Sequence, residues 1–249
     1  MERYIDMHCH ILPGVDDGAA NMEETERMLR IAYEEGVRCM IATPHYHPRR
    51  GHEKPEILKK KLTLVRKAAQ RIDDKFRIYL GTEIYFGQEI PKKLQQGEVL
   101  SMNRRNQVLV EFSPADNFSY IKQGLQHMQL AGYEVILAHA ERYLCLVDKF
   151  ELTEHIWNMG VNIQVNSGSI TGDSGRRAKQ FVKELLEREM VFSVGSDAHN
   201  SDSRAPRMEK AAAYVKKKYG AEYMKKIFYT NAATMLKKIE TEPGDKLSH

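Results

Sequence analysis

The segment Asp6-Met7-His8-Cys9-His10, followed by the turn Asp16-Asp17-Gly18, ends the first apolar, strand-like stretch of the chain. Residues two apart in an extended chain project to the same side, so His8 and His10 can reach one cation, while Cys9 points toward the core. Taken alone, the pair is as compatible with two structural histidines as with a metal site. The acidic turn favours the metal site, because a glycine-flanked loop can direct a carboxylate back toward the strand end.

Later strand-like stretches also end in a metal-capable side chain. Glu111 follows three apolar residues, where a lone carboxylate is costly to bury unless it is paired or bound to a cation. Each such residue has an ordinary structural explanation by itself, but together they recur at the same phase of the repeat. The sequence therefore predicts one metal centre to which the first cluster contributes along with His45, Glu83, Glu111, His139, Asp197 and His199.

The fold prediction follows from the alternation of strand and helix patterns, which indicates parallel βαβ units. A doubly wound open sheet is the alternative, but it concentrates its site at one crevice. Strands that nearly all end in a candidate ligand favour a closed barrel, whose strand C-termini converge on one mouth. About seven strands are predicted: Tyr4–His8, Cys39–Thr43, Arg77–Gly81, Gln107–Glu111, Glu134–Ala138, Val161–Asn166 and Val191–Gly195.

Local signals place the helices and the domain limits. Asn21 is predicted to cap the first helix, and the last helix is predicted over Asn231–Ile239. No convincing linker interrupts the chain, so residues 1–240 are expected to form a single domain. Residues 241–249 are expected to be a polar tail.

Composition limits the classes of protein that the chain can belong to. A formal net charge of +4 over 249 residues is too mild for a protein that coats nucleic acid. The three cysteines, Cys9, Cys39 and Cys145, are too few and too scattered for a disulfide framework. With no leader sequence and no apolar stretch long enough to span a bilayer, a cytoplasmic enzyme is expected, without membrane insertion.

The predicted ligands are imidazole and carboxylate groups, with no thiolate, which suits manganese, iron or zinc. About nine ligands exceed the needs of one ion, so two or three ions are implied, the closest pair roughly 3.5–4 Å apart. Such ions lower the pKa of a bound water toward ~7 and neutralise an oxyanion. Both properties suit hydrolysis of a phosphate ester.

At the level of motifs the chain resembles the PHP superfamily (polymerase and histidinol phosphatase). Within it, the chain is most similar to the metal-dependent protein-tyrosine phosphatases encoded with capsule and exopolysaccharide genes of Gram-positive bacteria. The resemblance rests on seven stretches: Asp6–Leu12, Val15–Gly18, Ala42–His45, Gly81–Glu83, His139–Arg142, Gln164–Asn166 and Ser196–His199.

The resemblance implies a distorted seven-stranded, TIM-like (β/α) barrel with three divalent ions, most often Mn²⁺, with iron or zinc as alternatives. By position it assigns one ion to His8, His10, Glu83 and Asp197, a second to Glu83, Glu111 and His139, and a third to Asp17, His45 and His199. It prefers Asp17 to Asp16 by spacing and leaves open whether Asp16 takes part. It also assigns the phosphoryl group to Arg142 and Arg204, whose guanidinium forks suit that task.

The expected function is hydrolysis of a phosphomonoester by metal-activated hydroxide, without a covalent phospho-enzyme. The resemblance implies that the substrate is the tyrosine-rich tail of a bacterial tyrosine autokinase. The alternatives are a histidinol-phosphate phosphatase, a PHP nuclease and a non-catalytic metal-binding module. Near the expected mouth, either a role in shaping the mouth or simple exposure is predicted for Tyr46, His47 and His52. Either contact with an aromatic leaving group or core packing is predicted for Tyr85 and Phe86.

Overall fold

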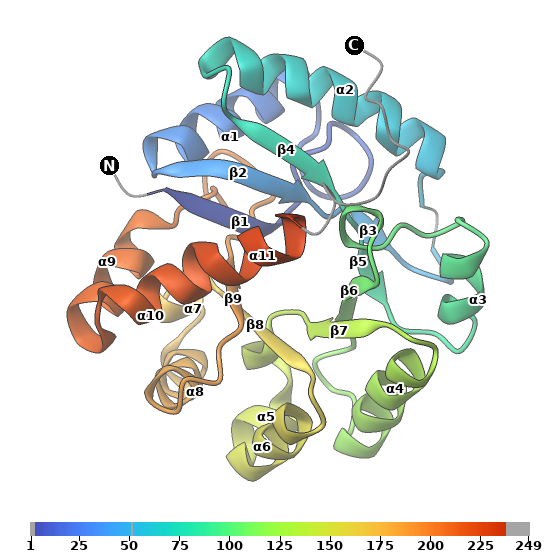
Figure 1. The fold of residues 1–249 in the computed structure, drawn as a ribbon, viewed down its shortest axis with the longest axis vertical. Helices are drawn as coiled ribbons and strands as arrows, with labels where there is room; N and C mark the ends of the chain where they lie inside the picture. Colours follow the sequence, from blue (N-terminus) through green and yellow to red (C-terminus); the bar gives the residue numbers. More distant parts are fainter. Residues whose placement is uncertain (1–2, 51, 238–249) are drawn as a thin grey trace.

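A curled parallel sheet with helices on its outer side forms the protein in the computed structural model, which describes residues 3–50 and 52–237 (Figure 1). Three strands pair in the order β1-β2-β4 and six pair in the order β3-β5-β6-β7-β8-β9, and every pairing is parallel. The predicted α/β class is thereby confirmed. The strands are β1 (Tyr4–Cys9), β2 (Val37–Ala42), β3 (His45–Tyr46), β4 (Arg77–Leu80), β5 (Glu83–Tyr85), β6 (Gln107–Glu111), β7 (Glu134–Leu137), β8 (Asn162–Asn166) and β9 (Ser193–Gly195).

Two of these strands were not foreseen as separate elements. β3 begins three residues after the last residue of β2, and β5 begins three residues after the last residue of β4. At both breaks the chain moves from one sheet to the other, and at both it places a metal-capable residue, His45 or Glu83, first in the new strand. The two breaks therefore determine where the side chains of His45 and Glu83 lie.

The last strand lies beside the first, although the two belong to different sheets. The amide of Asp197 donates to the carbonyl of His8 over 2.8 Å, and the amide of His10 donates to the carbonyl of Ala198 over 2.9 Å. These two hydrogen bonds join the first and last strands. They lie beside the first predicted ligands in the sequence, His8 and His10, and the last ones, Asp197 and His199.

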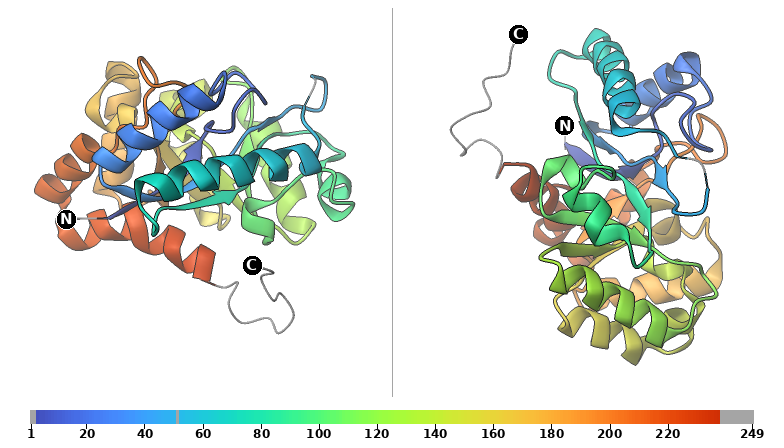
Figure 2. Two further views of the ribbon diagram at one scale, coloured as in Figure 1. Left: turned by 90° about the horizontal axis from the view of Figure 1, so that it is seen from above. Right: turned by 90° about the vertical axis from the view of Figure 1, so that its right-hand side faces the viewer.

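The helices pack against the outer side of the strands (Figures 1 and 2). The predicted cap of the first helix is confirmed, since the Asn21 side chain accepts a hydrogen bond from the amide of Glu24 over 3.0 Å. The helices are α1 (Met22–Glu34), α2 (Pro55–Ile72), α3 (Ile90–Gln95), α4 (Phe118–Leu130), α5 (Leu144–Asp148), α6 (Phe150–Asn158), α7 (Ser167–Thr171), α8 (Arg176–Glu187), α9 (Glu209–Tyr219), α10 (Ala221–Lys225) and α11 (Asn231–Lys237), with a π-helical turn joining the last two.

A second, smaller hydrophobic cluster fills the inside of the curled sheet. Its strand residues include Ile5, Met7 and Leu109, and α11 adds Met235 and Leu236. Figure 2 shows α11 on one side of the strands and α1 on the opposite side. α11 thus covers the interior of the curled sheet.

Some predictions concern residues beyond those described. The polar tail 241–249 and the end of the last helix at Ile239 lie outside the described residues. None of the helices within 3–50 and 52–237 is long and apolar enough to cross a membrane. The three cysteines are all described, and all three are free thiols.

Candidate metal centre

The structure brings all nine predicted ligands to one end of the strands. Strands β1, β3, β5 and β6 carry ligands themselves, and the segments directly after β1, β7 and β9 carry the remaining ones. Because parallel strands end at the same edge, side chains far apart in the sequence become neighbours. The nine residues are His8, His10, Asp17, His45, Glu83, Glu111, His139, Asp197 and His199.

The Glu83 carboxylate lies at the centre of this group, and only 1% of its side chain is exposed. Its Oε2 atom is 3.1 Å from Nε2 of His8, 3.1 Å from Nε2 of His10 and 3.1 Å from Nδ1 of His45. Its Oε1 atom is 2.7 Å from Nε2 of His139. Four imidazoles from three segments of the chain therefore converge on one carboxylate.

This convergence fits a bound cation better than a hydrogen-bond network. Oε2 of Glu83 is buried and has no hydrogen-bond partner among the described residues, in spite of its three close nitrogens. The Nε2 atoms of His8 and His10 also face each other over 3.2 Å. A buried polar atom without a partner costs ~1–3 kcal/mol, and a divalent ion bound among these nitrogens and oxygens would remove that cost.

Three groups of side chains are compact enough to hold an ion each. The group with Asp197 is identical to the expected set for the first ion. The group with Asp17 contains the expected set for the third ion and also His10. The group with Glu111 contains His45 in place of His139, which was expected for the second ion. His139 remains close, since its Nε2 atom is 3.7 Å from Oε2 of Glu111. The groups are His8, His10, Glu83 and Asp197; His10, Asp17, His45 and His199; and His45, Glu83 and Glu111.

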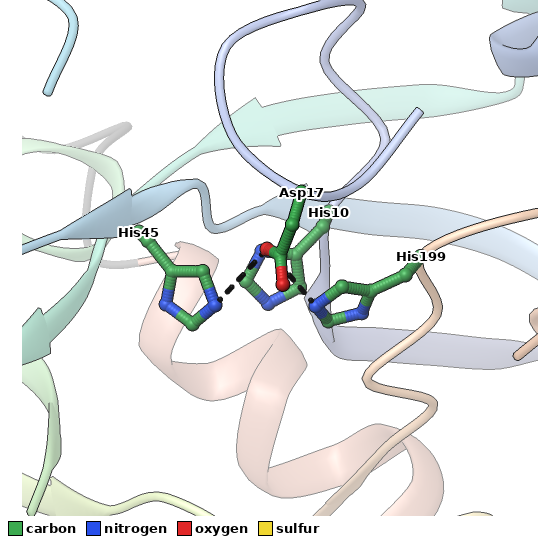
Figure 3. Close-up of side chains that lie close together, drawn as sticks. All are labelled: His10, Asp17, His45 and His199. Atoms are coloured by element: carbon green, nitrogen blue, oxygen red, sulfur yellow. Dashed lines mark ion pairs between the residues drawn. The ribbon is translucent and has the colours of Figure 1, made fainter. Parts of the chain in front are cut away.

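The two neighbouring aspartates of the acidic turn have different surroundings. Asp17 faces His45 and His199, with its Oδ1 atom 3.4 Å and 3.5 Å from their Nε2 atoms (Figure 3). Asp16 instead lies 2.8 Å from Nδ1 of His10 and accepts the amide of His45 over 3.0 Å. Asp16 therefore orients His10 and leaves the opposite ring nitrogen free for a cation.

Sequence reasoning missed the residues that orient the predicted ligands. Oε1 of Gln164 lies 3.2 Å from Nδ1 of His8 and accepts the amide of His139 over 2.8 Å. Nδ2 of Asn166 donates to Oδ2 of Asp197 over 2.9 Å. Gln164 and Asn166 lie two residues apart on the buried strand β8, so their side chains point to the same side. Polar residues that alternate with apolar ones on this strand were the sequence signal that could have identified them.

Backbone strain accompanies two of the predicted ligands. His139 has a φ of 32° and Asp197 a φ of 52°, in the left-handed region that non-glycine residues rarely adopt. Such conformations cost ~1–3 kcal/mol each and persist where the surroundings enforce them, often at functional sites. Gly195 permits the close approach at β9, since a Cβ atom there would lie 2.6 Å from Cβ of His8.

The two predicted phosphoryl-binding arginines both contact the Asp197 carboxylate. Arg142 donates to Oδ2 of Asp197, and Nη2 of Arg204 lies 3.1 Å from Oδ1. Their side chains are 42% and 41% exposed, whereas Asp197 is 3% exposed. Each guanidinium thus extends from a buried carboxylate to the solvent-facing rim of the cluster.

Protonation states follow from burial and from neighbouring charges. Burial and the adjacent His10 lower the pKa of His199 to about 3, so its imidazole is neutral at pH 7. Burial alone would raise the pKa of Glu83, but the imidazoles of His8, His10 and His139 outweigh it and hold that pKa well below its ordinary value. An ionised carboxylate and a neutral imidazole are the forms that bind metal.

Comparison with known proteins places the chain in a family. The family model described as capsular polysaccharide synthesis, CpsB/CapC, matches residues 4–237. The tyrosine-protein phosphatase CpsB of Streptococcus pneumoniae is 33% identical over 232 residues, which cover 91% of this chain and 96% of that protein. The tyrosine-protein phosphatase YwqE of Bacillus subtilis is 33% identical over 219 residues, covering 88% and 86%.

Solved structures are also similar to this chain. One chain from the crystal structures of YwqE and CpsB, described as unique metal-dependent tyrosine phosphatases, superposes with a TM-score of 0.82 at 32% identity and covers 88% of this chain and 89% of that one. An organophosphorus hydrolase from Deinococcus radiodurans reaches a TM-score of 0.58 at 10% identity over 92% of each chain, which shows a shared fold alone. The chain belongs to the CpsB/CapC family of capsular polysaccharide synthesis.

Proposed function

We propose that the protein is a metal-dependent phosphomonoesterase that hydrolyses phosphotyrosine in proteins. The observation that carries this proposal is the buried Glu83 carboxylate on which four imidazoles converge, with two half-exposed arginines held at the rim of the same cluster. Curated relatives with this activity, 33% identical over nearly the whole chain, support the choice of substrate.

The three compact groups would hold up to three divalent ions, for which we propose Mn²⁺, with iron or zinc as alternatives. The proposed ligands are the nine side chains at the strand ends, Glu83 being shared between ions. Bound ions would supply Lewis acidity, which makes water a nucleophile at neutral pH and neutralises charge on a phosphoryl group.

Two arginines of the chain are proposed to bind the phosphoryl group. Arg142 and Arg204 are proposed to bind the phosphoryl oxygens, because each presents exposed N–H donors beside the cluster. Asp197 fixes both guanidinium groups before substrate arrives, so little side-chain entropy remains to be lost on binding. Fixed donors aimed at developing charge supply most of the acceleration in phosphoryl transfer.

The proposed function includes a single catalytic domain with a barrel fold. We infer that β2 with β3, and β4 with β5, each act as one interrupted strand, which makes the sheet the expected seven-stranded barrel of the PHP type. The β1–β9 hydrogen bonds support its closure. Ligands drawn from His8 through His199 support one catalytic domain over residues 1–240.

The proposed partner is the phosphorylated tyrosine-rich tail of a bacterial tyrosine kinase that acts in capsule or exopolysaccharide synthesis, in the cytoplasm. The family's role in capsular polysaccharide synthesis supports this choice.

Rates on four substrates test the proposed function. Purified protein loaded with Mn²⁺ is expected to hydrolyse a phosphotyrosine peptide at least about 100-fold faster than the matched phosphoserine peptide, because a phenolate leaves more easily than an alkoxide (a difference in barrier of about 2.7 kcal/mol). Histidinol phosphate and single-stranded DNA serve as the comparison substrates. A preference for histidinol phosphate, digestion of the DNA, or metal binding without turnover would each replace the proposal with one of the alternatives.

No thiol is expected to act as the nucleophile. The thiols of Cys9 and Cys39 have raised pKa values because they are buried, that of Cys39 reaching about 12, so neither is a thiolate at neutral pH. Cys145 shows the same direction of shift from partial burial. Replacing each cysteine by Ser should leave kcat/KM on the phosphotyrosine peptide within about threefold. Loss of activity in one of these variants, with folding intact by circular dichroism, would contradict a metal-dependent mechanism.

A further inference from the structure

Two aromatic rings lie together just beyond the proposed metal ligands. Tyr85 is the last residue of β5, and His47 directly follows β3. Their ring centroids are 4.3 Å apart and their planes differ by 27°, which is a stacked arrangement. Both side chains are half-buried.

The position of this pair relative to the ligands follows from strand geometry. Each ring lies two residues after a ligand, His47 after His45 and Tyr85 after Glu83, and residues two apart on a strand share a face. Tyr85 is also opposite Glu111 in the parallel pairing of β5 with β6. The ring pair therefore continues the face of the sheet that carries the ligands, one step of roughly 6.6 Å farther along the strands.

The other rings at this end of the sheet have structural roles. Phe86 and Tyr46 are each 3% exposed and belong to the main hydrophobic core. Phe86 packs on Phe112 at a centroid distance of 5.3 Å, and the Tyr46 hydroxyl accepts a hydrogen bond from Lys93 over 2.7 Å. Tyr85, by contrast, is part of neither hydrophobic cluster of the described residues, so core packing does not account for its ring.

The chain itself fixes the orientation of the histidine ring. The amide of Arg49 donates to Nδ1 of His47 over 3.1 Å. That bond fixes the ring against Tyr85 in a loop that is otherwise exposed around Arg49 and Arg50. A ring pair held in this way is organised before any ligand arrives, which reduces the entropy lost on binding.

We propose that His47 and Tyr85 form the platform that receives the aromatic ring of the substrate, and so select aryl over alkyl phosphates. The proposal rests on the proposed phosphatase function and adds the residues that recognise the leaving group. In an aryl phosphate a single oxygen separates the ring from phosphorus, so a phosphoryl group at the ligands and arginines places the ring one step outward, where the pair lies. A substrate aryl group can stack on these rings or pack edge-to-face against them, which favours its binding. A serine side chain has no ring and cannot make such a contact.

The test compares His47→Ala and Tyr85→Ala with the unaltered protein, all loaded with Mn²⁺. Each variant is expected to raise KM for p-nitrophenyl phosphate about fivefold to tenfold, the size of one aromatic contact, and to change KM for a phosphoserine peptide by less than twofold. Tyr85→Phe should restore the KM for the aryl ester, because it keeps the ring. His52→Ala is the matched control, since His52 lies in the same loop but packs in a tilted arrangement against Tyr46, with the ring centroids 4.1 Å apart.

A binding measurement separates this proposal from the proposed function. Calorimetry should show that phenylphosphonate binds the unaltered protein about tenfold more tightly than methylphosphonate, and that Tyr85→Ala removes the difference. Turnover of phosphotyrosine with equal binding of the two phosphonates, or equal KM changes for aryl and alkyl esters, would overturn the platform and leave the phosphatase intact. Tighter phenylphosphonate binding without turnover would support the platform and overturn the phosphatase.

Discussion

Replacing Glu83 by Gln is expected to lower kcat/KM on a phosphotyrosine peptide about 10³-fold or more, because removing a single preorganised group from an active site already costs 10²–10³. Among the residues that the structure describes, this carboxylate alone contacts His8, His10, His45 and His139 together. Gln has nearly the same shape, so the change removes the negative charge and one acceptor while keeping the volume. Metal content, measured by mass spectrometry, should fall together with the rate.

The control for this variant is Glu134→Gln. Glu134 is exposed at the first residue of β7, the opposite end of the strands, where it accepts a hydrogen bond from Gln107 over 2.6 Å that a Gln oxygen can still accept. Its activity should stay within about twofold of the unaltered protein. Full metal content and full activity in Glu83→Gln would show that Glu83 does not hold the ions, and the proposed set of ligands would be wrong.

Removal of metal by a chelator is expected to reduce hydrolysis to the background rate, and added Mn²⁺ is expected to restore it. The thermal midpoint should rise on reloading, because an ion that binds only the folded state stabilises it by mass action. A panel of manganese, iron and zinc, with midpoint and rate recorded for each, ranks the candidate ions. Unchanged activity after metal analysis confirms complete removal would exclude the proposed chemistry.

Reloading should also depend on pH. Burial lowers the pKa of His10, but the hydrogen bond with Asp16 and the neighbouring carboxylates outweigh it and raise that pKa well above its ordinary value. The pKa of His8 is raised as well, against the effect of burial, by Glu83 and Asp197. In the metal-free protein these rings hold protons that an ion must displace, so the Mn²⁺ concentration for half-restoration should fall as the pH rises from 6 to 8, by up to about tenfold per unit for each proton released. A concentration independent of pH would contradict ligation by these two histidines.

The main lines of the fold and of the site could be read from the sequence because both depend on local patterns. Apolar runs that end in His, Asp or Glu predicted that Glu111 and His139 lie at strand ends, and the structure places both there, 3.7 Å apart. The i, i+2 rule likewise brought His8 and His10 together, as their 3.2 Å separation shows.

What the sequence did not predict depends on contacts between distant segments. The breaks that create β3 and β5 contain Pro44 and Gly81, which indicate a turn, but neither residue shows that the chain changes sheets there. The different roles of Asp16 and Asp17 are set by which of the two meets the His10 ring. Gln164 serves two ligands at once, a fact that only the folded arrangement of β8 reveals.

The hydrogen bonds between β1 and β9 also bear on how the protein is made. The proposed centre takes residues from His8 to His199, so a chain emerging from the ribosome cannot complete it until His199 has been synthesised. Contacts of such long sequence separation form late and slowly, because loop-closure entropy must be overcome first. Until then two of the three candidate ion sites lack a member, Asp197 in one and His199 in the other. Metal loading is thereby tied to completion of the fold, and a chain truncated before β9 would have neither a closed sheet nor a working centre.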